Sequence, residues 1–311
     1  MQCYSPLSAF QPASGGRVYF ADKKANPSDK ALQLPCGQCI GCRLRKSAEW
    51  AIRCVHEAQL HDENCFVTLT YDDEHLPHDG SISKKHMSQF MKTLRKKLVE
   101  DYGSGKKVRF FGCGEYGEQL QRPHYHLALF GFRPDDLVLY TVREGVSLYT
   151  SDFLSARWGR GFVTVGELTF ESAAYIARYV TKKIKVSEKS DPKYRYHYEK
   201  MDPYTGEIYE IQPEFVNMSR RPGIAAEWMR RYKSDVYPDD FITHQGRTLR
   251  TPRYYDKIYD EHDPVTLEEV KQKRLEMAHK KRADNTPERL KVKQKVTEAK
   301  MSIYSSRSYE S

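Results

Sequence analysis

The sequence lacks several features that would place it in a common class of protein. No apolar run approaches the ~20 residues that a helix needs to cross a bilayer, so we expect no membrane span. The N-terminus has no basic segment followed by an apolar core, and we expect no signal peptide. No repeat of roughly 20–50 residues is present, which excludes a solenoid. The segment G-x4-G-K-[ST] is missing too, which argues against an intrinsic P-loop helicase.

The composition indicates a charged protein with a modest core. The 311 residues allow one catalytic domain of ~150–200 residues with appendages, or two domains. Hydrophobic residues make up 39% of the chain, charged residues 30%, and the mean hydropathy is −0.76. The seven cysteines are an odd number, which disfavours a complete disulfide framework and favours a reducing compartment. The net charge of +9 suits an anionic partner, by default nucleic acid, although charge alone would also fit a membrane surface.

The stretch Gly112–Gly131 holds a pair of histidines next to an apolar run. Residues i and i+2 of a strand share a face, so His124 and His126 are expected to project together. Two imidazoles with a carboxylate can form a metal site that has open positions. Glu115 is the preferred carboxylate because it ends the preceding strand candidate, and Glu118 is the alternative. Taken alone, such a histidine pair is more often an ordinary surface pair.

A helix expected at Glu171–Lys185 carries two tyrosines. Tyr175 and Tyr179 are four residues apart and therefore share a helical face. A phenol, a divalent metal and cations are the parts needed to transfer a phosphodiester onto tyrosine. The alternative is that both tyrosines are half-buried packing residues. The surrounding cations are Arg178, Lys182 and Lys183.

A dense cysteine cluster, C-x2-C-x2-C, precedes a helix expected at Arg43–His61. Cys36, Cys39 and Cys42 can hold zinc or an iron–sulfur cluster if a fourth ligand is supplied, and zinc fits best. Reduced thiols in a glycine-rich turn are an equally weighted interpretation. The candidates for the fourth ligand are Cys3, Cys54, Cys65 and His56.

Several segments together resemble a known family. H-Y-H at residues 124–126 fits the histidine–hydrophobic–histidine motif of the HUH endonucleases, with tyrosine in the middle position. Y-x3-Y-x2-K at residues 175–182 fits their nucleophile motif in its two-tyrosine form, and F-V-T-L-T-Y at residues 66–71 resembles their first, strand-borne motif. With the cysteine cluster and N-M-S-R-R-P-G at residues 217–223, the chain resembles the replication initiation proteins of gokushovirus-like microviruses, small single-stranded DNA phages. The resemblance covers roughly residues 30–235.

The resemblance implies a site-specific single-strand endonuclease and ligase that starts rolling-circle replication. Glu115, His124 and His126 would hold Mg or Mn, and a tyrosine would attack the origin DNA. The products would be a 5′-phosphotyrosine and a 3′-OH primer, and the reverse reaction would rejoin strands and release circles. Lys182 follows Tyr179 by three residues, as the family motif requires, which slightly favours Tyr179 for the first cut.

The expected fold class is α+β. The order strand–helix–strand–strand–helix–strand–helix suits an antiparallel sheet with helices on one face. The resemblance implies the same architecture, with about five strands and the histidines facing the tyrosine helix. We expect an irregular segment at 1–42 with the cysteine cluster, an endonuclease domain at 43–235, and an irregular then charged helical tail at 236–311. The pattern at 135–149 is ambiguous.

The expected partners follow from this activity. Single-stranded origin DNA would contact Arg178, Lys183 and a basic loop at Arg220 and Arg221. A host helicase and DNA polymerase would be needed, in the cytoplasm of a bacterial host. Three rivals remain: an HUH transposase or relaxase, a non-enzymatic zinc-containing DNA-binding protein, and a zinc hydrolase of small phosphoesters.

Overall fold

The computed structural model describes residues 3–20, 26–117, 120–143, 145–182, 195, 197–202 and 204–305, with the backbone alone at 143, 179–182 and 303–305. The chain divides into two compact units. We call residues 47–267 the central unit, and residues 1–46 together with 268–311 the terminal unit. Among the helices that the structure describes, none is both long and apolar enough to pass through a membrane. The domain boundaries expected after residues 42 and 235 stay a prediction.

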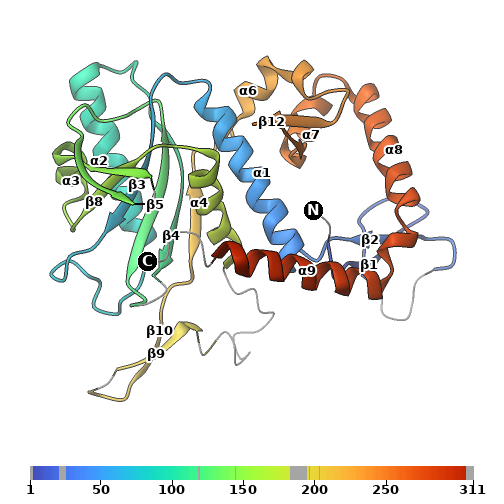
Figure 1. The fold of residues 1–311 in the computed structure, drawn as a ribbon, viewed down its shortest axis with the longest axis horizontal. Helices are drawn as coiled ribbons and strands as arrows, with labels where there is room; N and C mark the ends of the chain where they lie inside the picture. Colours follow the sequence, from blue (N-terminus) through green and yellow to red (C-terminus); the bar gives the residue numbers. More distant parts are fainter. Residues whose placement is uncertain are drawn as a thin grey trace. The chain divides into compact units, whose positions relative to one another are not determined.

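A seven-stranded sheet organises the central unit (Figure 1). Its order is β11-β4-β5-β3-β8-β7-β6, and every neighbouring pair is antiparallel. Strand β5 is thus hydrogen-bonded on both sides. The strands are β3 (Asn64–Thr70), β4 (Arg109–Tyr116), β5 (Pro123–Phe130), β6 (Val138–Arg143), β7 (Val146–Thr150), β8 (Val163–Gly166) and β11 (Phe215–Met218).

Two helices cover one face of the sheet. Helix α2 (Lys84–Tyr102) repeats apolar residues at helical spacing, and helix α3 (Asp152–Trp158) begins at a serine cap. Phe90 and Trp158 are buried in one cluster with Leu127 of β5. This face therefore holds the larger part of the core.

Two other helices cover the opposite face. Helix α1 (Ile40–Ala58) contributes Ala51, and helix α4 (Phe170–Lys182) contributes Ile176, to a second buried cluster with Ala128 of β5 (Figure 1). Small alanines at these positions let the helices approach the sheet closely. The helices were expected on one face only, and that expectation is wrong because β5 alternates apolar side chains toward both faces.

The expected α+β class with an antiparallel sheet is confirmed, but the sheet has seven strands instead of about five. Two of the added strands are β6 and β7, a hairpin formed by the segment with the ambiguous pattern. Strand β11 was expected as part of a basic loop. It is short, and it exists because it pairs with β4, with Phe215 opposite Gly114 and Met218 opposite Phe111.

The remaining elements of the central unit lie after α4. The segment 236–258 was expected to be irregular, but it contains a hairpin and a helix. The elements are β9 (Glu199–Met201), β10 (Ile208–Glu210), α6 (Ala226–Arg231), the 3-10 helix η1 (Lys233–Asp235), β12 (Phe241–His244), β13 (Arg247–Arg250) and α7 (Arg253–Asp260).

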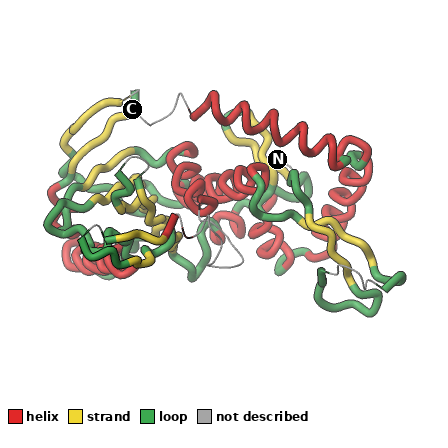
Figure 2. The backbone as a smooth tube through the Cα atoms, turned by 90° about the horizontal axis from the view of Figure 1, so that it is seen from below, coloured by secondary structure: helices red, strands yellow, loops and turns green. Residues whose placement is uncertain are grey.

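The terminal unit combines both ends of the chain. Strand β1 (Leu7–Gln11) pairs with β2 (Lys30–Leu34), so residues 1–42 are not wholly irregular (yellow in Figure 2). Their pairing joins segments separated by nineteen or more residues, which local pattern does not reveal. The charged helical tail is confirmed as α8 (Pro264–Lys280) and α9 (Pro287–Ser305), with the 3-10 helix η2 (Ala283–Asn285) between them.

Candidate active site

The strand register brings the carboxylate to the histidines. In the β4–β5 pair, Glu115 lies opposite His124, and Cys113 lies opposite His126. Directly opposed residues of an antiparallel pair project to the same face. His124 and His126 share that face because they are two residues apart on β5. The backbone alone therefore places all three side chains together, as the sequence predicted.

The three side chains converge on one carboxylate oxygen. Oε1 of Glu115 lies 2.9 Å from Nε2 of His124 and 2.9 Å from Nε2 of His126. The side chains of Glu115 and His126 are 2% and 8% exposed, and that of His124 is 17% exposed. The group is thus buried on one side and reachable by solvent near His124.

Other contacts orient the two imidazoles. Nδ1 of His124 lies 3.1 Å from the carbonyl oxygen of Arg122, so Nδ1 carries the proton and Nε2 keeps a free electron pair. Nδ1 of His126 lies 3.0 Å from Oγ1 of Thr68. Such contacts at the second ring nitrogen fix the tautomer and the direction of a metal-binding imidazole. Both Nε2 atoms are therefore aimed at Glu115.

The carboxylate is held in its charged form. Burial would raise the pKa of Glu115, but the hydrogen bonds from His124 and His126 outweigh burial and keep this pKa below its ordinary value. The second oxygen, Oε2, is buried and receives no hydrogen bond from any residue that the structure describes. A buried carboxylate oxygen without a donor is costly, and a cation would satisfy it.

The donor set and its spacing fit a divalent metal ion. The three ligand atoms all lie within 4.8 Å of one another. Two ligands at right angles on an ion ~2.1 Å away are ~3 Å apart, which is close to the observed contacts of 2.9 Å. Two imidazoles and one carboxylate leave further coordination positions open. The group could therefore hold Mg or Mn together with a substrate oxygen.

Helix α4 brings a tyrosine to this group. The ring of Tyr175 meets the ring of His126 edge-on, with 5.0 Å between centroids and an interplanar angle of 86°. The guanidinium of Arg178 lies 5.3 Å from the centroid of the Tyr175 ring. A phenol and a cation thus lie beside the histidines, on the face that the sequence predicted.

Several predicted site residues are only partly visible. Tyr179 and Lys182 lie on α4, one and nearly two turns after Tyr175, but the structure describes only their backbone. Glu118, the alternative ligand, and Lys183 lie outside the described residues. Their predicted roles stay predictions.

The middle residue of the H-Y-H motif points to the other face, as expected. Tyr125 is fully buried, and its hydroxyl lies 2.6 Å from that of Tyr71. The same oxygen accepts a hydrogen bond from the backbone N–H of Ser83 at 2.8 Å. The expectation that this hydroxyl needs a partner is confirmed, and the contacts join β5 to the start of α2.

The acidic loop after β3 is built from its own pairs. Oδ1 of Asp72 accepts hydrogen bonds from the backbone N–H and the imidazole Nδ1 of His75, at 2.8 and 2.7 Å. Asp73 forms an ion pair with Arg122 at 2.7 Å. The loop therefore supports the residue whose carbonyl orients His124.

The predicted arginines of the basic loop lie away from this group. Arg220 and Arg221 are exposed and follow β11, whose last residue, Met218, is opposite Phe111 of β4. Four residues of strand separate Phe111 from Glu115, a span of about 14 Å. A phosphate contact by these arginines would therefore be remote from the metal-binding residues.

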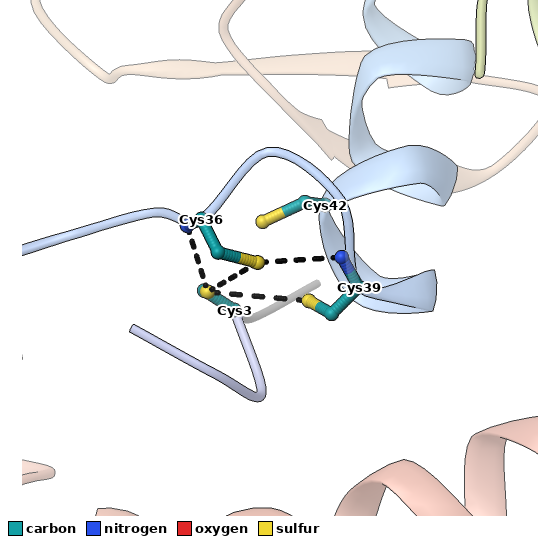
Figure 3. Close-up of side chains that lie close together, drawn as sticks. All are labelled: Cys3, Cys36, Cys39 and Cys42. Atoms are coloured by element: carbon teal, nitrogen blue, oxygen red, sulfur yellow. Dashed lines mark hydrogen bonds between the residues drawn. The ribbon is translucent and has the colours of Figure 1, made fainter. Parts of the chain in front are cut away.

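A second candidate metal group lies in the terminal unit. The Sγ atoms of Cys36, Cys39 and Cys42 gather with that of Cys3, all within 4.8 Å of one another (Figure 3). Of the four candidates for a fourth ligand, the structure thus selects Cys3. The other candidates, Cys54, Cys65 and His56, are buried in the central unit.

Comparisons with known proteins agree with this arrangement. Residues 64–184 match a family model described as a replication-associated protein of the ORF2 type. That span runs from the start of β3 to just beyond α4, and includes the whole Glu–His–His group and Tyr175. No solved structure matches the chain.

Phage proteins match over most of the chain. Replication-associated protein VP4 of Bdellovibrio phage phiMH2K is 34% identical over 270 residues, which are 85% of this chain and 79% of that protein. The chain belongs to this family of replication-associated proteins. Replication-associated protein ORF2 of Spiroplasma virus 4 is 32% identical over 301 residues, 89% of this chain and 87% of that protein. Replication-associated protein ORF4 of Chlamydia phage 1 is 38% identical over 162 residues, 50% of this chain and 40% of that protein.

Two residues around the site of this replication-associated protein were not singled out from the sequence. Thr68 contacts His126 because it lies opposite that histidine in the β3–β5 register. Arg122 orients His124 through its backbone carbonyl, and its side chain reaches the loop after β3. The strand signal at residues 66–71 pointed to this segment, but only the register identifies which threonine meets which histidine.

Proposed function

We propose that the protein starts replication of a small phage genome by cutting one strand at the origin and joining the cut end to tyrosine. One observation carries this proposal: a buried Glu115–His124–His126 group lies against Tyr175, within the segment shared with the replication-associated family. Ligands, phenol and cation are the parts needed for phosphoryl transfer to a side chain.

The proposed reaction exchanges one phosphodiester for another. The phenol oxygen of Tyr175 or Tyr179 attacks phosphorus and forms the new P–O bond. The bond between phosphorus and the 3′ oxygen of the preceding nucleotide breaks, and the proton lost by the phenol ends on that oxygen. The products are a 5′-phosphotyrosine and a free 3′-OH, which primes synthesis. The number of phosphodiester bonds is unchanged, so the reverse attack by a 3′-OH rejoins strands without ATP.

The residues around the site have distinct roles in this reaction. A divalent ion held by Glu115, His124 and His126 would supply positive charge to the phosphate in the transition state. Arg178 adds a fixed cation beside the Tyr175 ring. Lys182 lies on α4 at the position that the two-tyrosine motif assigns to its lysine.

Two tyrosines on one helix support repeated turnover. While one tyrosine is esterified, the other can attack the regenerated origin and release a circle. Tyr175 is supported by its contact with His126, and Tyr179 by the sequence motif. The sequence has no P-loop, so strand separation falls to a host helicase and synthesis to a host polymerase, in the host cytoplasm.

A covalent-adduct assay tests the proposal. The protein is incubated with labelled single-stranded DNA from a cognate phage origin, with and without Mn, and resolved on a denaturing gel. We expect a metal-dependent adduct that survives in each of Tyr175→Phe and Tyr179→Phe for one round and disappears in the double variant. Tyr204→Phe is the control, because Tyr204 is 96% exposed and belongs to neither group.

The opposite result is equally clear. Tight DNA binding without an adduct, over several origins and metals, would mean that the protein is a non-enzymatic DNA-binding protein. An adduct that persists in the double variant would place the nucleophile elsewhere.

A further inference from the structure

We propose that Cys3, Cys36, Cys39 and Cys42 bind one zinc ion as a closed structural site of the terminal unit. This site is separate from the Glu–His–His group and from the proposed reaction, and it would hold zinc whether or not the protein cuts DNA.

The sulfur positions match one tetrahedral zinc ion. The Sγ atom of Cys3 lies 3.6 Å from that of Cys36 and 3.9 Å from that of Cys39. Four thiolates at ~2.3 Å around a tetrahedral ion are ~3.8 Å apart, midway between the two observed distances. A disulfide would need about 2.05 Å, and all four cysteines are free thiols. The spacing is therefore that of ligands to one ion.

The geometry also favours a single ion over an iron–sulfur cluster. In a cluster, each thiolate binds a different iron, so the sulfur atoms are spread around several metal atoms. Here the four sulfur atoms converge on one point (Figure 3). Four thiolates around one ion are a common structural zinc site.

Backbone N–H groups support the thiolates. The N–H of Cys36 donates to Sγ of Cys3, and the N–H groups of Gln38 and Cys39 donate to Sγ of Cys36, at 3.3 to 3.4 Å. The N–H of Tyr4 donates to Sγ of Cys39 at 3.3 Å. Hydrogen bonds to the sulfur favour the charged thiolate that zinc requires. The chain is therefore folded around the sulfur atoms as ligands.

The site joins segments that have little other support. Cys3 and Cys36 enclose the β1–β2 hairpin, and Cys42 lies in the first turn of α1. The hydroxyl of Tyr4, next to Cys3, lies 2.8 Å from Oγ1 of Thr297 on α9. A zinc ion at the cysteines would thus fix the N-terminal segment and, through Tyr4, its contact with the last helix.

Cobalt substitution tests this site directly. Co(II) bound by four thiolates gives intense charge-transfer and d–d absorption bands that imidazole and carboxylate ligands do not produce. We expect the full-length protein, purified under reducing conditions, to contain about one zinc ion per chain and to show these bands after exchange with cobalt. The His124→Ala/His126→Ala variant should show the same bands, which separates this site from the other group.

Substitutions identify the fourth ligand. Cys3→Ser should lose the four-thiolate spectrum and release zinc to a chelator at least about tenfold faster. Cys65→Ser is the matched control, because the Cys65 thiol donates to the carbonyl of Phe132 at 3.4 Å and serine preserves that donor. It should keep both zinc and spectrum.

Three results would overturn the inference. The first is wild-type protein that takes up cobalt without thiolate bands, a measurement that does not depend on any variant folding. The second is an unchanged spectrum in Cys3→Ser, which would exclude Cys3 as a ligand. The third is iron in place of zinc in the purified protein.

Discussion

The two candidate metal groups differ in the number and the kind of their ligands. Glu115, His124 and His126 supply three donors, carried by two paired strands and oriented by neighbouring oxygen atoms. The cysteine group supplies four thiols, carried by a loop, a helix start and the N-terminal segment, and oriented by backbone N–H groups. Three donors leave room for a substrate oxygen, whereas four thiolates close the coordination of zinc. The first group suits chemistry and the second suits structure.

The two units differ as sharply in charge. The terminal unit has nineteen lysines and arginines against nine aspartates and glutamates, a net charge of +10. The central unit has 32 against 33, a net charge of −1, and the two sets together make up the 51 and 42 of the whole chain. The basic character that indicated a nucleic-acid partner therefore belongs to the unit without the Glu–His–His group. Affinity for a polyanion and cleavage chemistry are expected to separate between the units.

The largest expected effect is the loss of one metal group while the other persists. We expect His124→Ala/His126→Ala to lower the rate of adduct formation by at least about 100-fold, because the charge opposite the phosphate is lost. Gel quantification of adduct against time gives the rate. His75→Ala is the control, since His75 pairs with Asp72 in the exposed loop after β3. Adduct formation at the wild-type rate in the double variant would remove the histidines from the mechanism.

A smaller effect is expected from the residue that orients His126. Thr68→Val keeps the shape of the side chain but removes the hydroxyl 3.0 Å from Nδ1. We expect the apparent affinity for Mn, measured from the metal dependence of adduct formation, to fall about 10- to 100-fold. Saturating Mn should restore most of the rate. Thr70→Val is the control, because its hydroxyl donates to the carbonyl of Phe162 instead. Equal Mn dependence in both variants would contradict an orienting role for Thr68.

These contacts show which parts of the site could be predicted from the sequence. The alternation of His124 and His126 and the four-residue spacing of the tyrosines are local periodicities, and the structure preserves both. Glu115 was reachable because it ends a strand next to a turn. The thiolate spacing of Cys36, Cys39 and Cys42 is local as well.

Other parts depend on pairing between distant segments. Thr68 meets His126 only through the β3–β5 register, and β11 is a strand only because β4 offers an edge. Cys3 joins Cys36 across 33 residues. Short polar strands such as β1 have a weak local pattern, so their existence follows from tertiary contacts.

The central unit should also respond to acid through one buried histidine. Burial lowers the pKa of His56 to about 3 from an ordinary 6.5, and the ring is stacked on Trp228 with Nδ1 2.8 Å from the hydroxyl of Tyr255. The folded state keeps His56 neutral, while the unfolded state gains a proton below pH 6.5. Stability from this group is thus complete above pH 6.5 and falls as the pH drops toward 3.

The size of this effect is modest near neutrality. At pH 5.5 we expect the free energy of unfolding to fall by about 1.4 kcal/mol more in the wild type than in His56→Phe, relative to pH 7.5. Denaturant titrations followed by tryptophan fluorescence would measure it. A chelator that removes zinc from the terminal unit should leave this difference unchanged. Identical pH slopes in the two proteins would contradict it.

The smallest effect concerns the charge of the terminal unit. Lys280, Lys281 and Arg282 are exposed between α8 and α9. Changing all three to Gln should reduce the slope of log affinity for single-stranded DNA against log salt by up to about 2, or ~0.7 for each lost phosphate contact. The control changes Lys85, Lys92 and Lys96, which are exposed on α2, to Gln. An equal loss in the control would contradict the division between the units.

Mass spectrometry of the wild-type adduct tests the central claim most directly. The DNA is trimmed with nuclease and the protein is digested with trypsin, which cuts after Arg160, Arg178 and Lys182. Tyr175 then lies in the peptide 161–178 and Tyr179 in the peptide 179–182. We predict that the nucleotide mass is carried by one or both of these peptides. A nucleotide on any of the other 20 of the 22 tyrosines, with neither of these two peptides modified, would contradict the account.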